Sequence, residues 1–359
     1  MPNHLTLAVA GGRKTQGIVE RCAAQPPERR ILVLTYTQAN QEELRNRLRL
    51  YAGDRHHVEV MGWFTFLLRH FAKPFLPFKF SRQRVLGFNF EGQPDRYAVG
   101  KNRFLDSNGA AFACELGRLA NELVTDSNGA LLRSLECIYD EILIDEIQDS
   151  SAHDWDILDV LLRSSIDIRM VGDIRQSVLA TNSRSRKNAK YSYAKAISWF
   201  RERQKSGLLE IQDSVVSWRC HPDIAAFSDT IFDPSWMFPA TQSANEMVTD
   251  HDGVYLVASK HVAEYVNFYQ PRCLRSMVTS GKKFDLDFLN FKIAKGMTYE
   301  RVLIVPTMPI RKFIRAGTFL EATPASSFYV AVTRAKQSVA IVLDKPGASQ
   351  LPVWTPSLK

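Results

Sequence analysis

The feature that most constrains the fold is a short apolar run followed at once by carboxylates, ILIDEIQDSS at residues 142–151. Such runs are typical of buried strands, and side chains at the carboxyl end of a parallel strand usually face a binding site. Mg²⁺ prefers carboxylate and phosphate oxygens, and a second carboxylate can orient or deprotonate a water. The pattern predicts that Asp145 binds metal and that Glu146 acts on water. The alternative is a strand end with a solvated acidic loop.

A second feature, near the N-terminus, predicts a phosphate-binding turn. An apolar run at residues 5–10 continues into the candidate phosphate ligands Gly11, Gly12, Arg13, Lys14 and Thr15. In a strand–turn–helix unit of this kind, backbone N–H groups face a phosphate, a lysine reaches its outer oxygens, and a hydroxyl binds Mg²⁺. The pattern GxxxxGK[ST] is not met, because Ala8 and Arg13 stand at its glycine positions. The alternative is a tight turn with a solvated basic pair.

Strand-like and helix-like segments alternate along the chain, which predicts an α/β fold. Apolar runs typical of buried strands recur at residues 5–10, 30–35, 57–61, 142–144, 168–171, 208–211, 253–258, 288–293, 302–306 and 339–343. This alternation favours parallel sheets flanked by helices, with ligands at the carboxyl ends of the strands. A joint near residues 204–207 predicts an N-terminal domain, residues 1–205 with a small insertion at about 76–110, and a C-terminal domain, residues 206–359.

Composition narrows the class of protein. With 359 residues, 45% of them hydrophobic, the chain can form two domains of ordinary size and is not expected to be disordered. Its net charge of +8 favours a polyanionic partner. Five scattered cysteines without a CxxC pair are typical of a reducing compartment, and no apolar stretch reaches membrane-spanning length. We therefore expect a cytoplasmic protein without a membrane partner.

Polar residues that follow later apolar runs are candidates for contacts with phosphate. Gln176 in GDIRQS stands just past a strand, where its amide can sense a terminal phosphate. Arg219 in SWRCHPDI and Arg334 in YVAVTRAK lie in the expected second domain, from which arginines can stabilise charge in phosphoryl transfer. The stretch TNSRSRKNAK is either a solvated loop or one that binds a nucleic-acid backbone through Arg184, Arg186 and Lys187.

The order of the motifs carries more information than any one of them. After the phosphate turn come TYTQAN, GWFTF, DEIQDSS, GDIRQS, SWRCHPDI, AKGMTYERVLIVPT and YVAVTRAK, which together cover residues 5–343. This order resembles that of the superfamily 1 DNA helicases of the UvrD/Rep type, in a minimal form with reduced accessory subdomains. The resemblance implies two tandem RecA-like domains of the P-loop NTPase class, with ATP between them. It also implies an ATP-dependent translocase or helicase on single-stranded DNA, with 3′-to-5′ movement.

The resemblance also implies roles for the matched residues. Lys14 would bind phosphate, Thr15 and Asp145 would bind Mg²⁺, and Glu146 would act on the attacking water. The other residues expected at the nucleotide are Gly11, Gly12 and Arg13 in the turn, Gln176, Arg219 and Arg334 at the γ-phosphate, Trp218 at adenine, and Lys295 and Gly296 in a turn linking ATP to DNA. Those expected at DNA are Tyr36, Thr37, Gln38, Trp63 and Phe64, with core packing as the alternative for at least one of the GWFTF aromatics.

Several departures from the family pattern leave a second function open. Val9 and Arg13 replace glycines that are usual in the phosphate turn, and Trp218 replaces the usual tyrosine. About 60 residues separate SWRC from AKG, too few for the large subdomain that family members insert there. The alternative function is a non-catalytic module of the same fold, which would bind DNA, nucleotide or a nuclease partner with little turnover.

Overall fold

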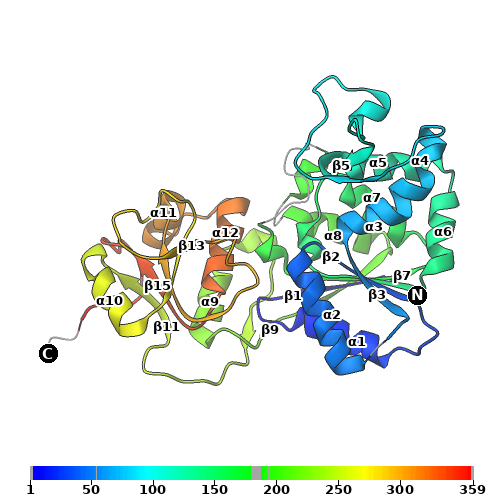
Figure 1. The fold of residues 1–359 in the computed structure, drawn as a ribbon. Coiled ribbons are helices and arrows are strands. Elements are labelled where there is room, and N and C mark those ends of the chain that lie inside the picture. The colour runs from blue at the N-terminus through cyan, green and yellow to red at the C-terminus, as the bar shows by residue number, and fades with distance from the viewer. Residues whose placement is uncertain (1–2, 54, 179–186, 193–194, 357–359) are drawn as a thin grey trace. The chain divides into compact units, whose positions relative to one another are not determined.

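The structure is a computed structural model that describes residues 3–53, 55–178, 187–192 and 195–356. The chain divides into two compact units (Figure 1). The first unit comprises residues 1–6, 14–172 and 180–212, and the second comprises residues 7–13, 173–179 and 213–359. Two short segments from the N-terminal part of the chain therefore pack with the second unit, one just before Lys14 and one just after Gly172.

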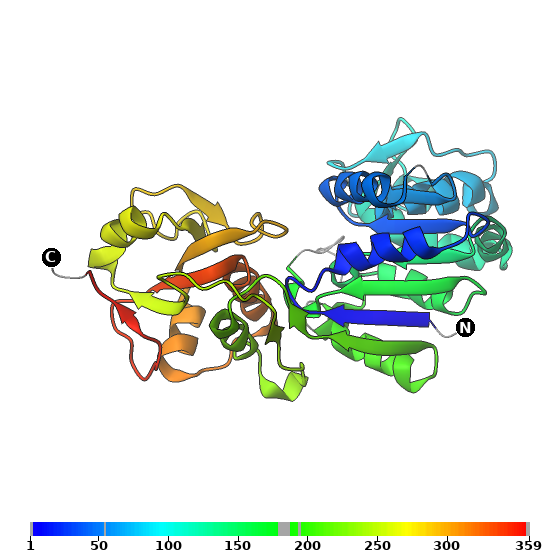
Figure 2. The same ribbon diagram turned by 90° about the horizontal axis from the view of Figure 1, so that it is seen from below.

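A six-stranded sheet with the order β3-β2-β6-β7-β1-β8 forms the centre of the first unit (Figure 2). Its strands are β1 (Asn3–Ala8), β2 (Ile31–Thr35), β3 (Val58–Gly62), β6 (Glu141–Ile144), β7 (Asp167–Gly172) and β8 (Leu209–Ser214). β2 pairs in parallel with β3 and β6, and β6 pairs in parallel with β7. Because parallel neighbours end at one edge of a sheet, the residues that follow β2, β6 and β7 lie close together there.

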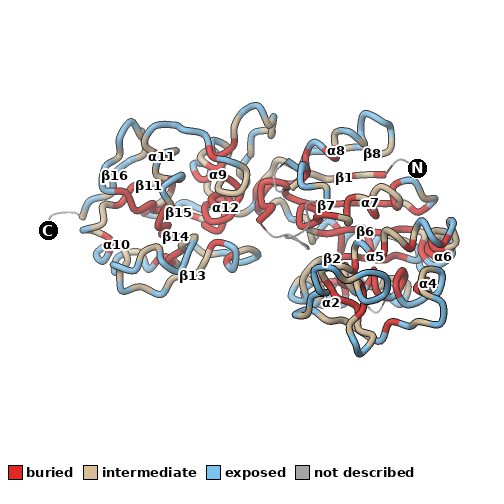
Figure 3. The backbone as a smooth tube through the Cα atoms, turned by 90° about the horizontal axis from the view of Figure 1, so that it is seen from above, coloured by how far each residue is buried: buried red, intermediate tan, exposed pale blue. Residues whose placement is uncertain are grey.

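Helices cover both faces of this sheet, with α1 and α2 on one face and α5 and α7 on the other (Figure 1). The helices of the unit are α1 (Lys14–Ala24), α2 (Gln38–Ala52), α3 (Trp63–Phe66), α4 (Lys73–Lys79), α5 (Ala113–Asp126), α6 (Ala130–Ile138), α7 (Asp154–Leu162) and α8 (Ala196–Lys205). Ile18 and Cys22, four positions apart on α1, pack with Leu44 of α2 against Val33 and Leu143 of the sheet. Buried residues are concentrated in the strands, and β2 and β6 are buried throughout (Figure 3).

The segment expected as an insertion contains a small parallel sheet of its own. β4 (Gly87–Asn89) pairs with β5 (Ala110–Phe112). Phe90, which follows β4, meets the ring of Phe64 edge-on at 5.8 Å between centroids. This contact connects the insertion to the GWFTF segment of the same unit.

The second unit is built on another six-stranded sheet, with the order β13-β12-β14-β15-β11-β16 and parallel pairing between all neighbours. Its strands are β11 (Gly253–Val257), β12 (Arg272–Arg275), β13 (Phe288–Asn290), β14 (Tyr299–Val305), β15 (Ala335–Val342) and β16 (Val353–Trp354). A separate parallel pair joins β9 (Val216–Ser217) to β10 (Gln242–Ser243). The predicted α/β class, with parallel sheets flanked by helices, is confirmed.

The described helices of the second unit are α9 (Pro222–Asp229), α10 (Val262–Tyr269), α11 (Met308–Ala316) and α12 (Ala322–Val332). Val262 and Tyr265 of α10 pack against Leu303 and Ala340 of the sheet. Helix α12 is buried along almost its whole second half, from Phe328 to Val332. No helix in the described part of the chain is long and apolar enough to cross a membrane.

At the amino end of β6 a buried carboxylate is surrounded by arginines. Glu141 is 0% exposed and forms ion pairs with Arg21, with Arg29 at 2.6 Å and with Arg169 at 3.4 Å. The three guanidinium groups come from α1, from the loop before β2 and from β7. This network fixes the start of β6 against its neighbours, while Asp145 follows the other end of the strand.

We predict that Glu141→Gln lowers the free energy of unfolding by about 2–4 kcal/mol, because the three arginines then lose the charge of one buried carboxylate and share only Asp167. Urea unfolding at pH 7 measures the change. The matched control is Glu43→Gln, which removes an exposed pair with Arg47 and should cost about 0.5 kcal/mol or less. Equally small losses in both variants would show that the Glu141 network adds no stability.

Candidate functional site

In the first unit the phosphate turn and the acidic strand end are in direct contact. Asp145 is 1% exposed, and its N–H donates to the Leu34 carbonyl over 2.8 Å, which extends the ladder between β6 and β2. The Thr15 hydroxyl, in the first turn of α1, donates to Asp145 Oδ2 over 3.2 Å. Lys14 lies close enough to act on the same carboxylate electrostatically. These three residues therefore form one cluster, as the sequence predicts for a phosphate and metal site.

Glu146 follows in the left-handed conformation, with φ at 54°. A non-glycine residue there costs about 1 kcal/mol, and such strain is concentrated at functional sites. Its N–H donates to Asp145 Oδ1 over 2.9 Å, and its carboxylate accepts the Gln148 side-chain amide. Gly172, at the end of β7, has no room for a side chain, because a Cβ would lie 2.7 Å from Ile147 Cγ2 and would also meet Gln148 Oε1. The glycine lets Gln148 hold the Glu146 carboxylate in place.

The electrostatics of this cluster favour a bound cation. Burial and, to a smaller extent, the Glu146 carboxylate together raise the pKa of Asp145 to about 7, although Lys14, the Glu146 N–H and the Thr15 hydrogen bond oppose the shift. A divalent cation would favour the ionised form. The donor set of one hydroxyl and one carboxylate suits Mg²⁺, which takes its remaining ligands from water and phosphate. Within the described residues, no group of three His, Cys, Asp or Glu side chains could hold a metal without such additional ligands.

The residues expected at DNA follow β2 and β3. The Tyr36 hydroxyl pairs with Ser150 Oγ, its ring stacks on Trp63 at 5.8 Å between centroids, and burial raises its pKa well above the usual value. Trp63 is 1% exposed, and its indole N–H donates to Asp154 Oδ1 over 2.8 Å. Trp63 therefore supports Tyr36 from the core and offers no free ring face. Phe64 is half-buried.

The next two residues of the TYTQAN segment remain nearer the solvent. The Thr37 hydroxyl caps α2 by accepting the Asn40 N–H over 3.2 Å. Gln38 is exposed. Lys187 lies 3.6 Å from Asp156, whereas Arg184 and Arg186 lie outside the described residues.

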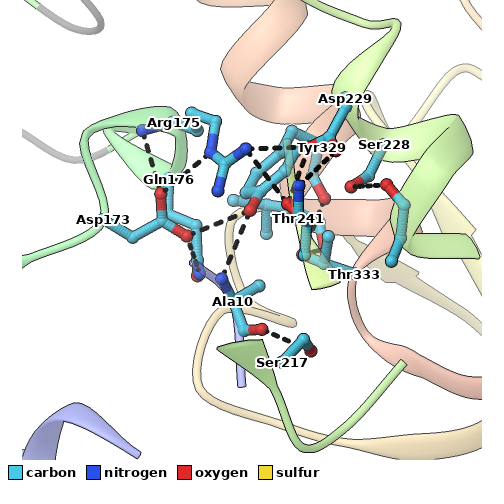
Figure 4. Close-up of polar contacts among 12 residues, drawn as sticks. Ala10, Asp173, Arg175, Gln176, Ser217, Ser228, Asp229, Thr241, Tyr329 and Thr333 are labelled. Atoms are coloured by element: carbon cyan, nitrogen blue, oxygen red, sulfur yellow. Dashed lines mark hydrogen bonds and ion pairs between the residues drawn. The ribbon is translucent and has the colours of Figure 1, made fainter. Parts of the chain in front are cut away.

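In the second unit a hydrogen-bonded chain joins three motifs that lie far apart in the sequence (Figure 4). The Gln176 amide donates to Asp173 Oδ2 over 2.8 Å, and its Oε1 accepts from Arg334 Nη2 over 2.9 Å. The Tyr329 hydroxyl, on α12, donates to Asp173 Oδ2 over 3.2 Å and accepts the Ala10 N–H over 3.3 Å. Burial raises the pKa of Tyr329, which keeps the hydroxyl protonated. The structure therefore connects the phosphate turn, GDIRQ and α12.

Both candidate arginines of the second unit are held in place by backbone carbonyls. Arg334 is 1% exposed and donates to the Val330 and Met297 carbonyls over 3.1 and 3.2 Å. Arg219 is half-buried, and its Nη1 donates to the Thr333 carbonyl over 3.1 Å. Met297 directly follows the Lys295–Gly296 turn, in which Gly296 has a φ of 88°. The SWRC, AKG and VTRAK segments therefore meet at the end of α12.

The first half of the phosphate turn is bound to the SWRC segment. The Ser217 hydroxyl donates to the Ala10 carbonyl over 2.7 Å, and the Trp218 N–H donates to the Gly11 carbonyl over 3.1 Å. A Cβ on Gly11 would lie 2.6 Å from Arg219 Cβ, and its φ is 77°, so only glycine fits there. Arg13 has a φ of 55° and lies with its guanidinium carbon 3.8 Å from the Trp218 ring centroid.

Four further residues contribute contacts that no sequence pattern predicts: Asp173, Ser217, Tyr329 and Thr333. All four stand in or beside recognised motifs, so the motif boundaries could have drawn attention to them. Their roles depend on which segments meet, and no local sequence pattern gives that information.

Residues 101–183 match the family model described as the UvrD/REP helicase N-terminal domain. This stretch includes DEIQD and GDIRQ, whose geometry is described above. This part of the chain is therefore similar to the N-terminal domain of the UvrD/REP helicases. The resemblance inferred from the order of the motifs is thereby confirmed. A comparison with curated proteins finds no match.

Solved structures with a similar fold include a complex of the Arterivirus nonstructural protein 10 (helicase) with DNA, at 13% identity and a TM-score of 0.51. The alignment covers 95% of this chain and 60% of that one. The same helicase in another crystal structure and the PRRSV helicase align over 95% of the chain at 13% identity, with TM-scores of 0.48 and 0.45, and the chain covers 59% and 52% of them. The chain thus spans little more than half the length of these helicases. The likeness to the DNA complex shows the fold, two RecA-like α/β units.

The raised pKa of Asp145 predicts an unusual dependence of stability on pH. Between about pH 4 and pH 7 the folded protein holds a proton on Asp145 that the unfolded chain releases, so this group's contribution to stability falls as pH rises. Without divalent metal, Asp145→Asn should therefore be more stable than wild type at pH 8 by roughly 2–4 kcal/mol. The difference should shrink towards pH 4. Urea unfolding across pH measures both values.

A control of opposite sign is Asp140→Asn. Arg30 lowers the pKa of Asp140 to about 2, so this carboxylate stabilises the fold at neutral pH and loses that effect only as pH falls towards 2. The Asp140 variant should be less stable than wild type at pH 8. If Asp145→Asn also proved less stable than wild type at pH 8, neighbouring groups would already stabilise the ionised Asp145 carboxylate in the metal-free protein.

Proposed function

We propose that the protein is an ATP-dependent translocase or helicase that moves 3′ to 5′ on single-stranded DNA. The observation that carries the proposal is the buried Asp145, which accepts the Thr15 hydroxyl beside Lys14 and is followed at once by the left-handed Glu146. Such an arrangement at the carboxyl edge of a parallel sheet would suit a metal ion and an attacking water. The UvrD/REP match and the fold shared with a DNA-bound helicase support the nucleic-acid part of the proposal.

The residues of the first unit suit hydrolysis of a nucleoside triphosphate. Mg²⁺ held by Thr15 and Asp145 would neutralise phosphate charge. Lys14 would bind the outer phosphate oxygens. Glu146 would orient a water and accept its proton as the water oxygen bonds to the γ-phosphorus, while the bond to the bridging oxygen breaks and ADP leaves.

The residues of the second unit suit stabilisation of phosphate charge. We assign Gln176, Arg219 and Arg334 to the γ-phosphate. Each is fixed by a hydrogen bond within its unit, Gln176 to Asp173, Arg219 to Thr333 and Arg334 to Val330. Groups fixed in this way need no reorganisation when charge develops, so they favour the transition state over the ground state. Gly296 directly precedes Met297, whose carbonyl accepts a hydrogen bond from Arg334. Lys295 and Gly296 would therefore link this centre to DNA.

Single-stranded DNA is the partner that fits the aromatic and polar residues after β2. We assign the Tyr36 ring to a base, and Thr37, Gln38 and Lys187 to the backbone. Trp63 would hold Tyr36 from beneath, and Phe64 would contribute at the edge of the same surface. Stacking combined with backbone charge binds single strands without reading their sequence.

The second candidate function is a non-catalytic module of the same fold that binds DNA or a nuclease partner. Arg13 favours it, because this residue takes the left-handed conformation that a glycine usually provides. Measurement of turnover separates the two candidates.

We predict that single-stranded DNA stimulates ATP hydrolysis and that Glu146→Gln abolishes it while nucleotide binding survives. The amide keeps the shape of the side chain but cannot accept the proton of the attacking water. Steady-state phosphate release with and without DNA, together with calorimetric binding of MgATP, measures both properties. Glu43→Gln, on the exposed face of α2, is the control for loss of charge alone. Equal slow hydrolysis by wild type and Glu146→Gln would favour the non-catalytic module.

A further prediction concerns Tyr36. Tyr36→Ala should weaken binding of an unstructured oligonucleotide about 5- to 150-fold, the loss of one stacked base, without changing the dependence on salt. Tyr36→Phe keeps the ring, loses only the contact with Ser150, and should bind nearly as wild type does. Lys187→Ala should instead flatten the salt dependence by roughly 0.7 if it binds one phosphate. Equal affinity for single strand and blunt duplex, with Tyr36→Ala silent, would contradict the assignment.

A further inference from the structure

The side-chain amide of Gln176 is held at both ends, which fixes its orientation. Its Nε2 donates to Asp173 Oδ2 over 2.8 Å, and its Oε1 accepts from Arg334 Nη2 over 2.9 Å. An ionised carboxylate can only accept and a guanidinium group can only donate, so reversal of the amide would lose both hydrogen bonds. All three residues belong to the second unit.

The Asp173 carboxylate is the buried partner that orients this amide. It is 2% exposed, its Oδ2 accepts from Gln176 and from the Tyr329 hydroxyl, and its Oδ1 accepts the Arg175 N–H over 3.1 Å. Tyr329 is 1% exposed, and its oxygen in turn accepts the Ala10 N–H over 3.3 Å (Figure 4). The Tyr329 hydroxyl therefore lies between the start of the phosphate turn and the carboxylate that holds Gln176.

The ring of Tyr329 is fixed by contacts that do not involve its hydroxyl. The Arg175 guanidinium carbon lies 4.9 Å from the ring centroid, and Phe232 packs edge-on against the ring at 5.5 Å between centroids. Arg175 is itself buried and pairs with Asp229 over 2.9 Å. Loss of the hydroxyl alone would therefore leave the ring in place and remove only its two hydrogen bonds.

We propose that Tyr329 is a positioning residue for hydrolysis, which acts through Asp173 to hold the Gln176 amide in the orientation that the γ-phosphate requires. The two hydrogen bonds of the amide use one N–H and one lone pair, so one of each remains for a phosphate oxygen and a water. Groups held in place before the reaction stabilise the transition state more than the ground state. This role rests on the proposed nucleotide hydrolysis and adds the Tyr329 hydroxyl to the residues on which it depends.

Steady-state ATP hydrolysis by Tyr329→Phe tests this role, with MgATP binding measured by calorimetry. The variant should lower kcat about tenfold, because the buried carboxylate loses one of its donors. The dissociation constant for MgATP should change less than about twofold, because Gln176 acts mainly in the transition state. The calorimetric stoichiometry counts folded sites, so kcat refers to folded protein alone. Weaker MgATP binding with an unchanged kcat would overturn the role.

Tyr265→Phe is the matched control. Tyr265 is 0% exposed and lies in the same unit, and its hydroxyl is hydrogen-bonded to His251 Nε2 over 2.8 Å. Loss of this hydroxyl should lower the stability of the fold without changing the kcat of folded protein. An equal fall of kcat in both variants would be a general effect of removing a buried hydroxyl, and the role of Tyr329 would then be wrong.

Combination with Gln176→Ala shows whether Tyr329 acts through the amide. Gln176→Ala and the double variant should have the same kcat, because Tyr329→Phe then has no amide left to displace. If the two losses multiplied instead, Tyr329 would act by another route and the proposal would be wrong.

Asp173→Asn is a second test, which leaves the Tyr329 side chain intact. It replaces a group that only accepts with an amide that has a donor end, and both Asp173 oxygens face donors. The variant should lower kcat at least as much as Tyr329→Phe does, with MgATP affinity within about twofold of wild type. A kcat equal to that of wild type would overturn the proposal.

These outcomes separate the proposal from the proposed function. Hydrolysis by wild type that continues unchanged in Tyr329→Phe would overturn the role of Tyr329 and leave the nucleotide site standing. Absence of hydrolysis by wild type, with MgATP bound, would overturn both.

Discussion

The organisation of the first unit depends on the Asp145 carboxylate, which is buried but must still be able to ionise and bind a cation. Because β6 lies between β2 and β7, the residue that follows it is excluded from water, and burial opposes its ionisation. Thr15 and the Glu146 backbone N–H each donate to one of its oxygens, and Lys14 adds positive charge. The position of the carboxylate therefore suits a bound cation. The phosphate turn, strand β6 and Glu146 all contact this one group.

In the second unit, neutral oxygens hold the two candidate arginines in place. Arg334 donates to two carbonyls and to the Gln176 amide, and Arg219 donates to a third carbonyl. Partners of this kind fix the position of a guanidinium group through hydrogen bonds and carry no full charge themselves. The Tyr329 hydroxyl adds hydrogen bonds to Asp173 and Ala10 to the same network. One buried helix, α12, thus supplies or contacts most of these groups.

The strands were predictable where their residues are apolar throughout. The apolar run at 30–35 agrees with β2 within one residue. No apolar run marks β12 (Arg272–Arg275), because arginines stand at both its ends although Cys273 and Leu274 are buried. Motif order was sufficient to identify residue types at the site. It could not show that Trp63 is buried under Tyr36 or that Arg13 lies on Trp218, since both contacts depend on tertiary packing.

The burial of the cysteines has a practical consequence. All five lie in the described part of the chain, where Cys22, Cys220 and Cys273 are buried, Cys114 is half-buried and Cys137 is exposed. Burial raises the pKa of the three buried thiols, and a protonated thiol reacts slowly with alkylating reagents. A maleimide dye should therefore attach first to Cys137, near the end of α6. The native sequence offers a fluorescent reporter on the first unit for single-molecule work, with few or no cysteines to remove.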